Sequence, residues 1–295
     1  MKHRGCYLKA IMPMFGNLFK DKKVLITGHT GFKGSWLAIW LNELGADVTG
    51  FALEPYTKKQ NFVVSDLKSK ITHIIGDIRA YSQLIDVFEK YKPEFVFHLA
   101  AQPIVRESYI NPKETYDVNV GGTVNLLECC RRCDSVRVII NVTSDKCYEN
   151  NEWIWGYREN DMLGGYDPYS SSKGCSELVT RAFRRSFFNP EKIEEHEKSL
   201  SSVRAGNVIG GGDWQKDRLI PDSIRALENK ESIKIRNPNA TRPWQHVLEP
   251  LSGYLLLASK MYEEPEKYAR AWNFGPEYNS MTTVAGIVEL IIKKW

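Results

Sequence analysis

Residues 23–36 read KVLITGHTGFKGSW, and this stretch decides the fold. The apolar run from Val24 to Ile26 ends abruptly before a glycine, which is typical of a buried central strand of a parallel sheet. Apolar residues then recur at helical spacing from Trp36 to Leu44, until Gly45 ends the helix. A second strand is predicted from Val48 to Leu53. The order strand, glycine loop, helix, strand predicts an α/β fold.

The loop carries Gly28, Gly31 and Gly34 between the strand and the helix. A dinucleotide needs a tight turn, a bare backbone beside its pyrophosphate, and a helix N-terminus with free N–H groups. The three glycines can supply these needs in that order. An ordinary strand-to-helix turn is the alternative, but the flanking strands favour a cofactor site. We therefore predict a Rossmann-type doubly wound parallel sheet with a smaller α/β substrate-binding lobe.

Length and composition limit the domain organisation and the partners. The chain has 295 residues, 42% of them hydrophobic, and a net charge of +4 from 40 basic and 36 acidic residues. We predict an N-terminal extension (residues 1–20), a dinucleotide-binding domain (21–200) and a partly interleaved substrate lobe (201–295). The charges are spread along the chain, which argues against nucleic acid as a partner. No apolar run is long enough for a membrane span.

Cysteine usage points to a reducing compartment and to no metal. Cys129, Cys130 and Cys133 crowd one predicted helix without a second CxxC pair or nearby histidines, so no metal site is expected. We interpret all six cysteines as reduced packing residues of a cytoplasmic protein. The other three are Cys6, Cys147 and Cys175.

The strand ends continue the pattern that the glycine loop begins. Asp77 follows a predicted strand at residues 71–76, where it is a candidate for the N-cap of a helix at 79–91. A strand at 136–142 delivers Thr143-Ser144-Asp145-Lys146 to the sheet edge where open α/β sheets bind ligands. Tyr169 and Lys173, four residues apart, share one face of a predicted helix, where the ammonium can lower the pKa of the phenol.

The GxxGxxG spacing resembles the extended short-chain dehydrogenase/reductase family, whose members include nucleotide-sugar epimerases and dehydratases. GHTGFKGSW, and RNPNATRPWQHV at residues 236–247, are similar to the CDP-glucose 4,6-dehydratases of that family. The resemblance implies NAD as cofactor. NAD is favoured over NADP because Ala52 stands at the expected ribose position, with Glu54 as the nearest acid and no arginine directly after it. The implied cofactor-binding residues are Gly28, Gly31, Phe32, Lys33, Gly34, Asp77, Ile78, Leu99, Ala100, Ala101, Asn119, Tyr169 and Lys173.

The same resemblance implies an NAD-dependent hydro-lyase that turns CDP-glucose into CDP-4-dehydro-6-deoxyglucose. Tyr169, assisted by Lys173, would take the C4 hydroxyl proton, and Ser144, or less favourably Thr143, would hydrogen-bond that oxygen. Asp145 would protonate the departing C6 hydroxyl, which requires a pKa raised by burial. Lys146 stands where related dehydratases carry a glutamate base. It could act as a neutral base or as a cation that stabilises the enolate, and both roles stay open.

The resemblance implies three residues for the substrate pyrophosphate, which arginine binds through paired hydrogen bonds: Asn207, Arg218 and Arg242.

Two other functions remain as alternatives: another nucleotide-sugar 4,6-dehydratase or 4-epimerase, and a catalytically impaired NAD-binding protein. The family often forms homodimers, for which the helices at 111–132 and 167–185 are the candidates. A dideoxysugar pathway of O-antigen biosynthesis is implied. Related chains continue beyond the helix that ends near Trp295, which implies C-terminal truncation.

Overall fold

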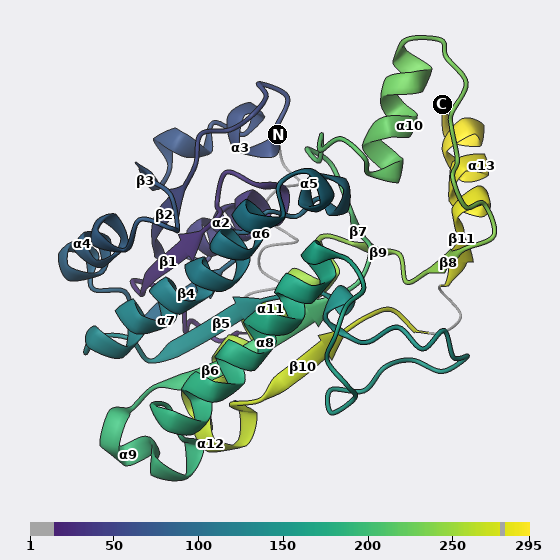
Figure 1. The fold of residues 1–295 in the computed structure, drawn as a ribbon. Coiled ribbons are helices and arrows are strands. Elements are labelled where there is room, and N and C mark those ends of the chain that lie inside the picture. Colours follow the sequence, from purple (N-terminus) through teal and green to yellow (C-terminus); the bar gives the residue numbers. More distant parts are fainter. Residues whose placement is uncertain (1–14, 278–280) are drawn as a thin grey trace.

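A computed structural model describes residues 15–277 and 281–295. Residues 1–14 of the predicted N-terminal extension, with Cys6, lie outside the described residues. Seven parallel strands form one sheet in the order β10-β6-β5-β4-β1-β2-β3, which confirms the doubly wound parallel fold (Figure 1). The strands are β1 (Lys23–Thr27), β2 (Asp47–Ala52), β3 (Thr72–Ile75), β4 (Phe95–His98), β5 (Val138–Val142), β6 (Ser199–Ala205) and β10 (Ala271–Phe274).

The strand order reverses between β1 and β4, because the chain first runs outward to β3 and then returns to the other side of β1. At such a point the connections leave in opposite directions, and a crevice opens at the carboxyl ends of the strands. The glycine loop follows β1 and the Thr143–Lys146 segment follows β5, one on each side of the reversal and both at the carboxyl ends of their strands. The topology therefore brings the predicted cofactor and catalytic segments to one edge of the sheet.

Two apolar layers hold helices on the two faces of the sheet. Val24 and Ile26 of β1 pack in one layer, and Leu25 packs in the other, as the two-residue period of a strand requires. The first layer includes residues of α2 (Phe32–Glu43) and α11 (Leu248–Glu263). The second includes residues of α4 (Tyr81–Tyr91) and α7 (Gly122–Arg132). Beside α7, α8 (Pro168–Ser186) crosses the sheet (Figure 1).

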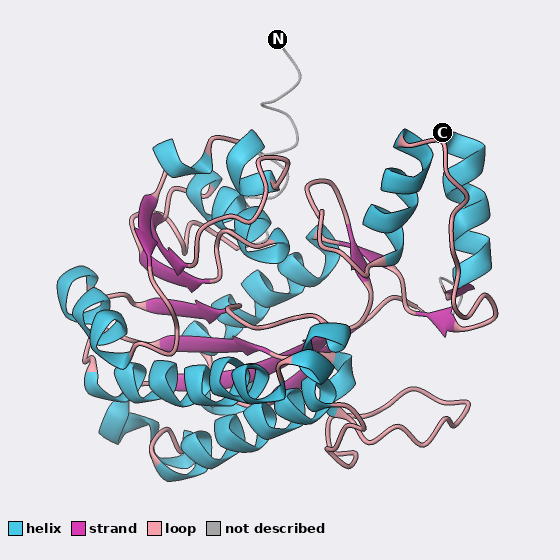
Figure 2. Cartoon of the chain, turned by 45° about the horizontal axis from the view of Figure 1, so that its top comes forward, coloured by secondary structure: helices cyan, strands magenta, loops and turns pink. Residues whose placement is uncertain are grey.

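A smaller lobe stands apart from the sheet and carries α10 and α13 side by side (Figure 2). Two short two-stranded sheets accompany this lobe. In one of them β7 pairs with β9, and in the other β8 pairs with β11. After β9 the chain returns to the main sheet to form α11 and β10. The elements are α10 (Leu219–Glu228), α13 (Val284–Lys294), β7 (Val208–Ile209), β8 (Thr241–Arg242), β9 (Gln245–His246) and β11 (Thr282–Thr283). The domain boundary at residue 200 stays a prediction.

The helix expected over residues 111–132 is present as α6 (Pro112–Tyr116), a π-helical turn (Asp117–Gly121) and α7 in unbroken succession. One local prediction needs correction. Asp77 is not the N-cap of α4, because the helix begins only at Tyr81 and the carboxylate instead accepts a hydrogen bond from the backbone of Arg79. Between β2 and β3, Phe62 of α3 (Asn61–Val64) packs in the first apolar layer.

The remaining helices are short or lie at the edges. They are α5 (Val105–Ile110), α9 (Ile193–His196), α12 (Pro265–Tyr268) and the 3₁₀ turns Leu67–Ser69, Asp145–Cys147 and Pro190–Lys192. None of the described helices combines the length and the apolar character that crossing a bilayer requires.

Candidate active site

A cavity of about 520 Å³ opens at the carboxyl ends of the strands. The glycine loop lines one part of it, and the segment after β5 lines another. Tyr169 and Lys173 reach it from α8, although more than 130 residues separate them from the glycine loop in the sequence. The fold therefore brings together the two groups of residues that the sequence pattern singled out.

The glycine loop fits a dinucleotide. Gly28 has a φ of +77°, and a Cβ there would lie 2.7 Å from the backbone nitrogen of Ala100. A Cβ on Gly34 would lie only 2.2 Å from the carbonyl oxygen of Gly28. No side chain caps the N-terminus of α2, so its first N–H groups are free to meet an anion. These features provide the tight turn, the bare backbone and the helix N-terminus that a pyrophosphate requires.

Most residues predicted to bind the cofactor line this cavity. They are Gly28, Gly31, Phe32, Lys33, Gly34, Asp77, Ile78, Leu99, Ala100, Ala101, Tyr169 and Lys173. Asn119 lies in the π-helical turn, 2% exposed and behind the cavity wall. Its amide accepts from the backbone of Gln102 at 2.8 Å and donates to Ser172 at 2.8 Å. Within the described residues no hydrogen bond joins it to Lys173, so it orders the neighbours of the lysine.

The proposed catalytic side chains gather at the end of β5 and the start of α8. Ser144, Asp145 and Lys146 all line the cavity together with Tyr169. The Ser144 hydroxyl donates to the Asp145 carboxylate at 3.0 Å and accepts from the backbone N–H of Lys146 at 3.2 Å. This turn holds the serine hydroxyl and the carboxylate close together beside the phenol, as a proton-transfer site requires.

Burial dominates the electrostatics of the site. It raises the pKa of Tyr169, and the adjacent Ser144 hydroxyl offsets only part of the effect. Burial also lowers the pKa of Lys173 to about 8, against the opposing influence of Glu177. Lys33 likewise has a pKa lowered to about 8 by burial and by Arg218, with Asp145 acting in the opposite direction. Burial therefore raises the pKa of Tyr169 in this structure, and the lowering of that pKa by Lys173 stays a prediction.

The structure distinguishes between the two hydroxyls at the end of β5. The Thr143 hydroxyl donates to Oε1 of Glu177 at 2.5 Å and lies 3.3 Å from the carbonyl oxygen of Val203. Both residues line the cavity, but these contacts hold the Thr143 hydroxyl within the protein and leave the Ser144 hydroxyl as the one available to a substrate. Glu177 was not singled out from the sequence, although its position four residues after Lys173 places it on the same helical face.

A second cavity of about 800 Å³ lies beside the first and shares Lys146, Asn207 and Arg218 with it. Arg242 lines only this second cavity, together with Arg236. The Arg218 guanidinium forms an ion pair with Asp213 at 2.9 Å, which fixes it where the two cavities meet. Trp244 also lines both cavities, and no sequence signal marked it beyond its place in the RNPNATRPWQHV string.

No candidate metal centre is present in residues 15–277 and 281–295, where no three His, Cys, Asp or Glu side chains cluster suitably. Cys129 and Cys130 are buried in α7, and burial raises the pKa of each thiol. These cysteines pack in the second apolar layer of the sheet.

Two curated proteins illustrate what this chain is similar to. CDP-glucose 4,6-dehydratase of Salmonella typhimurium is 55% identical over 279 residues, which cover 95% of this chain and 78% of the relative. GDP-mannose 4,6-dehydratase sdnI of Sordaria araneosa is 30% identical over 84% of this chain and 44% of its own length.

Solved structures share the fold. The epimerase Mth375 of Methanothermobacter thermautotrophicus superposes with a TM-score of 0.80 at 24% identity, covering 97% of this chain and 81% of that one. MoeE5 in complex with UDP-glucose and NAD gives 0.75 at 25% identity, covering 92% and 81%. The model of the NAD dependent epimerase/dehydratase family matches residues 24–275. The chain therefore belongs to the NAD dependent epimerase/dehydratase family.

Proposed function

We propose that this chain converts CDP-glucose into CDP-4-dehydro-6-deoxyglucose, as a hydro-lyase that ends the reaction with its cofactor unchanged. One observation carries the proposal. Ser144, Asp145, Lys146, Tyr169 and Lys173 face one cavity in a chain 55% identical to a CDP-glucose 4,6-dehydratase. NAD is the cofactor of the family, and the glycine loop fits its pyrophosphate.

Bound NAD supplies a hydride acceptor that later returns the hydride to the sugar. The residues of the chain handle the protons. Tyr169 takes the proton of the C4 hydroxyl, and Ser144 donates a hydrogen bond to the same oxygen. Lys173, one helical turn after Tyr169, holds the nicotinamide ribose and stabilises the phenolate. Because burial raises the pKa of Tyr169, this stabilisation has to come from the assembled complex.

Oxidation at C4 makes the neighbouring C5 proton acidic, because the carbonyl can accept the electron pair that the proton leaves behind. Lys146 lies at the point where the two cavities join, and acts there as base or as a cation that stabilises the enolate. Asp145 protonates the C6 hydroxyl, which departs as water. Return of a hydride to C6 and of a proton to C5 would then leave the sugar with the net loss of one water.

Cationic side chains support a diphosphate in the second cavity. Arg218 and Asn207 line both cavities, and Arg242 lines only the second cavity. A guanidinium offers paired, charge-assisted hydrogen bonds to phosphate oxygens, so these residues would hold the substrate pyrophosphate with its sugar in the first cavity. The nucleoside would then occupy the side of the second cavity formed by α10 and residues 232–237.

A homodimer is part of the proposal. Apolar side chains remain exposed on the helices predicted for the interface, among them Val124 on α7 and Leu178 and Phe187 on and after α8. Large exposed apolar side chains on neighbouring helices are typical of subunit contacts. The resemblance supports a cytoplasmic enzyme that supplies a dideoxysugar for O-antigen biosynthesis.

The test is to incubate the protein with NAD and CDP-glucose, and in parallel with the dTDP, UDP and GDP sugars, and to follow product mass. Loss of one water from CDP-glucose alone, without net NADH, is the expected result. An isomerised sugar of unchanged mass would indicate the 4-epimerase alternative, which has no need of the Asp145–Lys146 pair. A chain that binds NAD and changes no sugar would fit the catalytically impaired alternative. The Tyr169→Phe variant is the matched control for background chemistry.

A further inference from the structure

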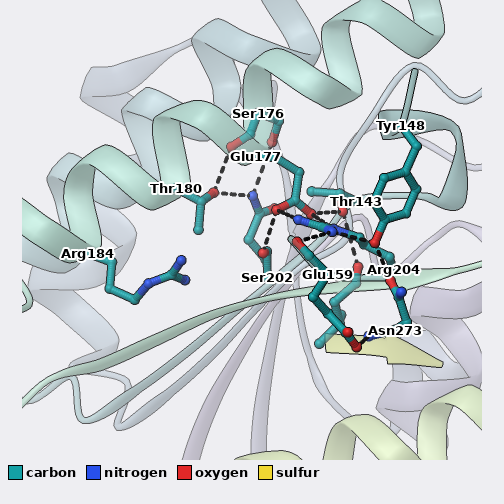
Figure 3. A network of polar contacts seen from close by, with 12 residues as sticks. Thr143, Tyr148, Glu159, Ser176, Glu177, Thr180, Arg184, Ser202, Arg204 and Asn273 are labelled. Carbon is teal, nitrogen blue, oxygen red and sulfur yellow. Dashed lines mark hydrogen bonds and ion pairs between the residues drawn. The ribbon is translucent and has the colours of Figure 1, made fainter. Parts of the chain in front are cut away.

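A buried ion pair, Glu177–Arg204, lies at the centre of a network of polar contacts that includes Thr143 (Figure 3). The Glu177 carboxylate of α8 accepts two hydrogen bonds from the Arg204 guanidinium of β6, from Nε at 2.9 Å and from Nη2 at 2.8 Å. Both side chains are 3% exposed. Ser202 donates to the same carboxylate at 2.6 Å. A buried charge pair is favourable only when its geometry and its remaining hydrogen bonds are complete, as they are here.

The carboxylate also accepts from the strand that carries the catalytic residues. Thr143, which immediately precedes Ser144, donates its hydroxyl to Oε1 of Glu177 at 2.5 Å. Glu177 follows Lys173 by one helical turn and Tyr169 by two, so the three side chains lie along one side of α8. A single carboxylate thus fastens the end of β5 to the helix that carries the phenol and the lysine.

The guanidinium reaches in the other direction, toward the long loop after β5. Its Nη1 donates to the Tyr148 hydroxyl at 2.5 Å and to the carbonyl oxygen of Glu159 at 3.1 Å. The Tyr148 hydroxyl in turn donates to Asn273 of β10 at 2.8 Å, and the backbone N–H of Asn273 donates to the Glu159 carboxylate at 2.8 Å. These bonds join the strand end, the helix, the loop and the returning strand β10.

We propose that Glu177 and Arg204 form a clamp that positions the end of β5 against Tyr169 and Lys173 and fixes the loop 149–164 beside them. Both are positioning residues, because neither lines the cavity and both act through residues that do. The Thr143 hydroxyl is the link between the clamp and the reacting groups. A shift of this strand end would move Ser144 and Asp145 away from the phenol. The inference rests on the proposed function only for its choice of substrate.

The Glu177 carboxylate has an electrostatic role in the same arrangement. Burial alone would raise its pKa, but the hydrogen bonds and charge of Arg204 reverse the effect, so its pKa is lowered and the carboxylate stays ionised. Its charge partly opposes the lowering of the Lys173 pKa by burial. Lys33 and His98 also face Lys173, and Cys147 lies beside it. The clamp therefore influences both the position and the charge of the site.

The sharpest test uses variants that leave the ion pair intact. Thr143→Val removes the hydroxyl that joins β5 to Glu177 and keeps the shape of the side chain, whereas Thr143→Ser keeps the hydroxyl. Thr180→Val is the matched control. Thr180 accepts from Asn141 of β5 at 2.7 Å, so this change removes a buried bond between the same helix and strand, away from the cavity.

Steady-state kinetics with whichever nucleotide sugar the wild-type protein dehydrates give the first readout. The clamp predicts that Thr143→Val lowers kcat by about tenfold to a hundredfold, as small displacements of reacting groups do. The KM should change by less than about twofold, because ground-state binding is untouched. Thr143→Ser should stay near wild type. Thr180→Val should lose thermal stability but keep kcat.

Equal losses of stability with unchanged kcat in Thr143→Val and Thr180→Val would overturn the proposal, since the bond would then serve folding alone. Amide hydrogen exchange with NAD alone gives a second readout that needs no substrate. Tyr148→Phe should accelerate exchange in residues 149–164 without affecting β1 or β4, and unchanged exchange would also overturn the clamp. A wild-type protein that dehydrates no sugar would refute the proposed function, and the exchange experiment would still decide on the clamp.

Discussion

Gly34 lies so close to Gly28 that a Cβ on Gly34 would stand 2.2 Å from the Gly28 carbonyl oxygen. The atoms that such a Cβ would meet all belong to the backbone of Gly28 and His29, so no side-chain rotation can relieve the clash. The first turn of α2 therefore packs closely against the loop after β1, and no side chain caps the N–H groups that could bind an anion there.

Gly34→Ala should therefore disrupt the cofactor site. We expect a destabilisation of about 1–3 kcal/mol, as for other overpacked positions. The displaced loop should also weaken NAD binding. We expect the affinity to fall by at least about tenfold, which corresponds to a loss of about 1.4 kcal/mol of binding free energy. Calorimetric titration with NAD and thermal unfolding measure both effects. Gly121→Ala is the control, because nothing lies within 4 Å of a Cβ there, and wild-type affinity in Gly34→Ala would contradict the close approach.

Lys33 should make NAD binding depend on pH. Its pKa is lowered to about 8 by burial and by Arg218, and the protonated form attracts a pyrophosphate. Affinity should be greatest below pH 8 and should fall as the pH rises through that value, because the ammonium then loses its charge. Lys33→Met should bind more weakly at neutral pH, by about tenfold, and should depend less on pH.

Titrations with NAD at a series of pH values check this prediction. Lys90→Met, a change at an exposed position of α4, should retain the wild-type dependence. Lys173 has a pKa lowered to a similar value. An unchanged pH dependence in Lys33→Met would therefore assign the titration to Lys173 and exclude Lys33 as its source.

The Glu177–Arg204 ion pair should contribute stability that disappears in acid. The folded-state pKa of Glu177 is lowered below its ordinary value of 4.5, so the contribution is fully present above pH 4.5 and is lost as the pH falls through the lower folded value. Glu177→Gln leaves Arg204 buried without its counter-charge and should cost about 3–5 kcal/mol at neutral pH.

Urea unfolding of Glu177→Gln and of the wild type, at neutral pH and at decreasing pH, measures this difference. The difference in the free energy of unfolding between the wild type and Glu177→Gln should decrease as the pH falls. Glu89→Gln, on the exposed face of α4, is a control with the same chemical change. If this difference in the free energy of unfolding stays constant down to the lowest pH at which both proteins fold, the Glu177–Arg204 ion pair is not the source of the pH-dependent stability.

Lys146 can be assigned a role by comparing two variants. Lys146→Met should lower kcat by about 10²- to 10⁴-fold, the usual contribution of a group that moves a proton. If the lysine acts as a base, Lys146→Glu should recover part of the rate and shift the pH–rate profile to lower pH. If its charge stabilises the enolate, Lys146→Glu should be slower than Lys146→Met, because a carboxylate repels that charge. Full activity in both variants would exclude both roles.

The sequence by itself determined the framework of this protein. The apolar run before Gly28, the helical spacing after it and the four-residue separation of Tyr169 and Lys173 are local patterns, and local backbone geometry alone turns them into strand, loop and helix faces. The position of Thr143–Lys146 at the edge of the sheet also followed, because the carboxyl ends of parallel strands meet there.

Only the tertiary structure decided which distant side chains meet. Thr143 and Glu177 are 34 residues apart, and Glu177 and Arg204 are 27 apart, so their contacts depend on how α8 packs across β5 and β6. That packing turned the Thr143 hydroxyl into the protein and left the Ser144 hydroxyl facing the cavity. It also enclosed Tyr169 and Lys173, and the resulting loss of solvent shifted their pKa values in directions that sequence spacing does not encode.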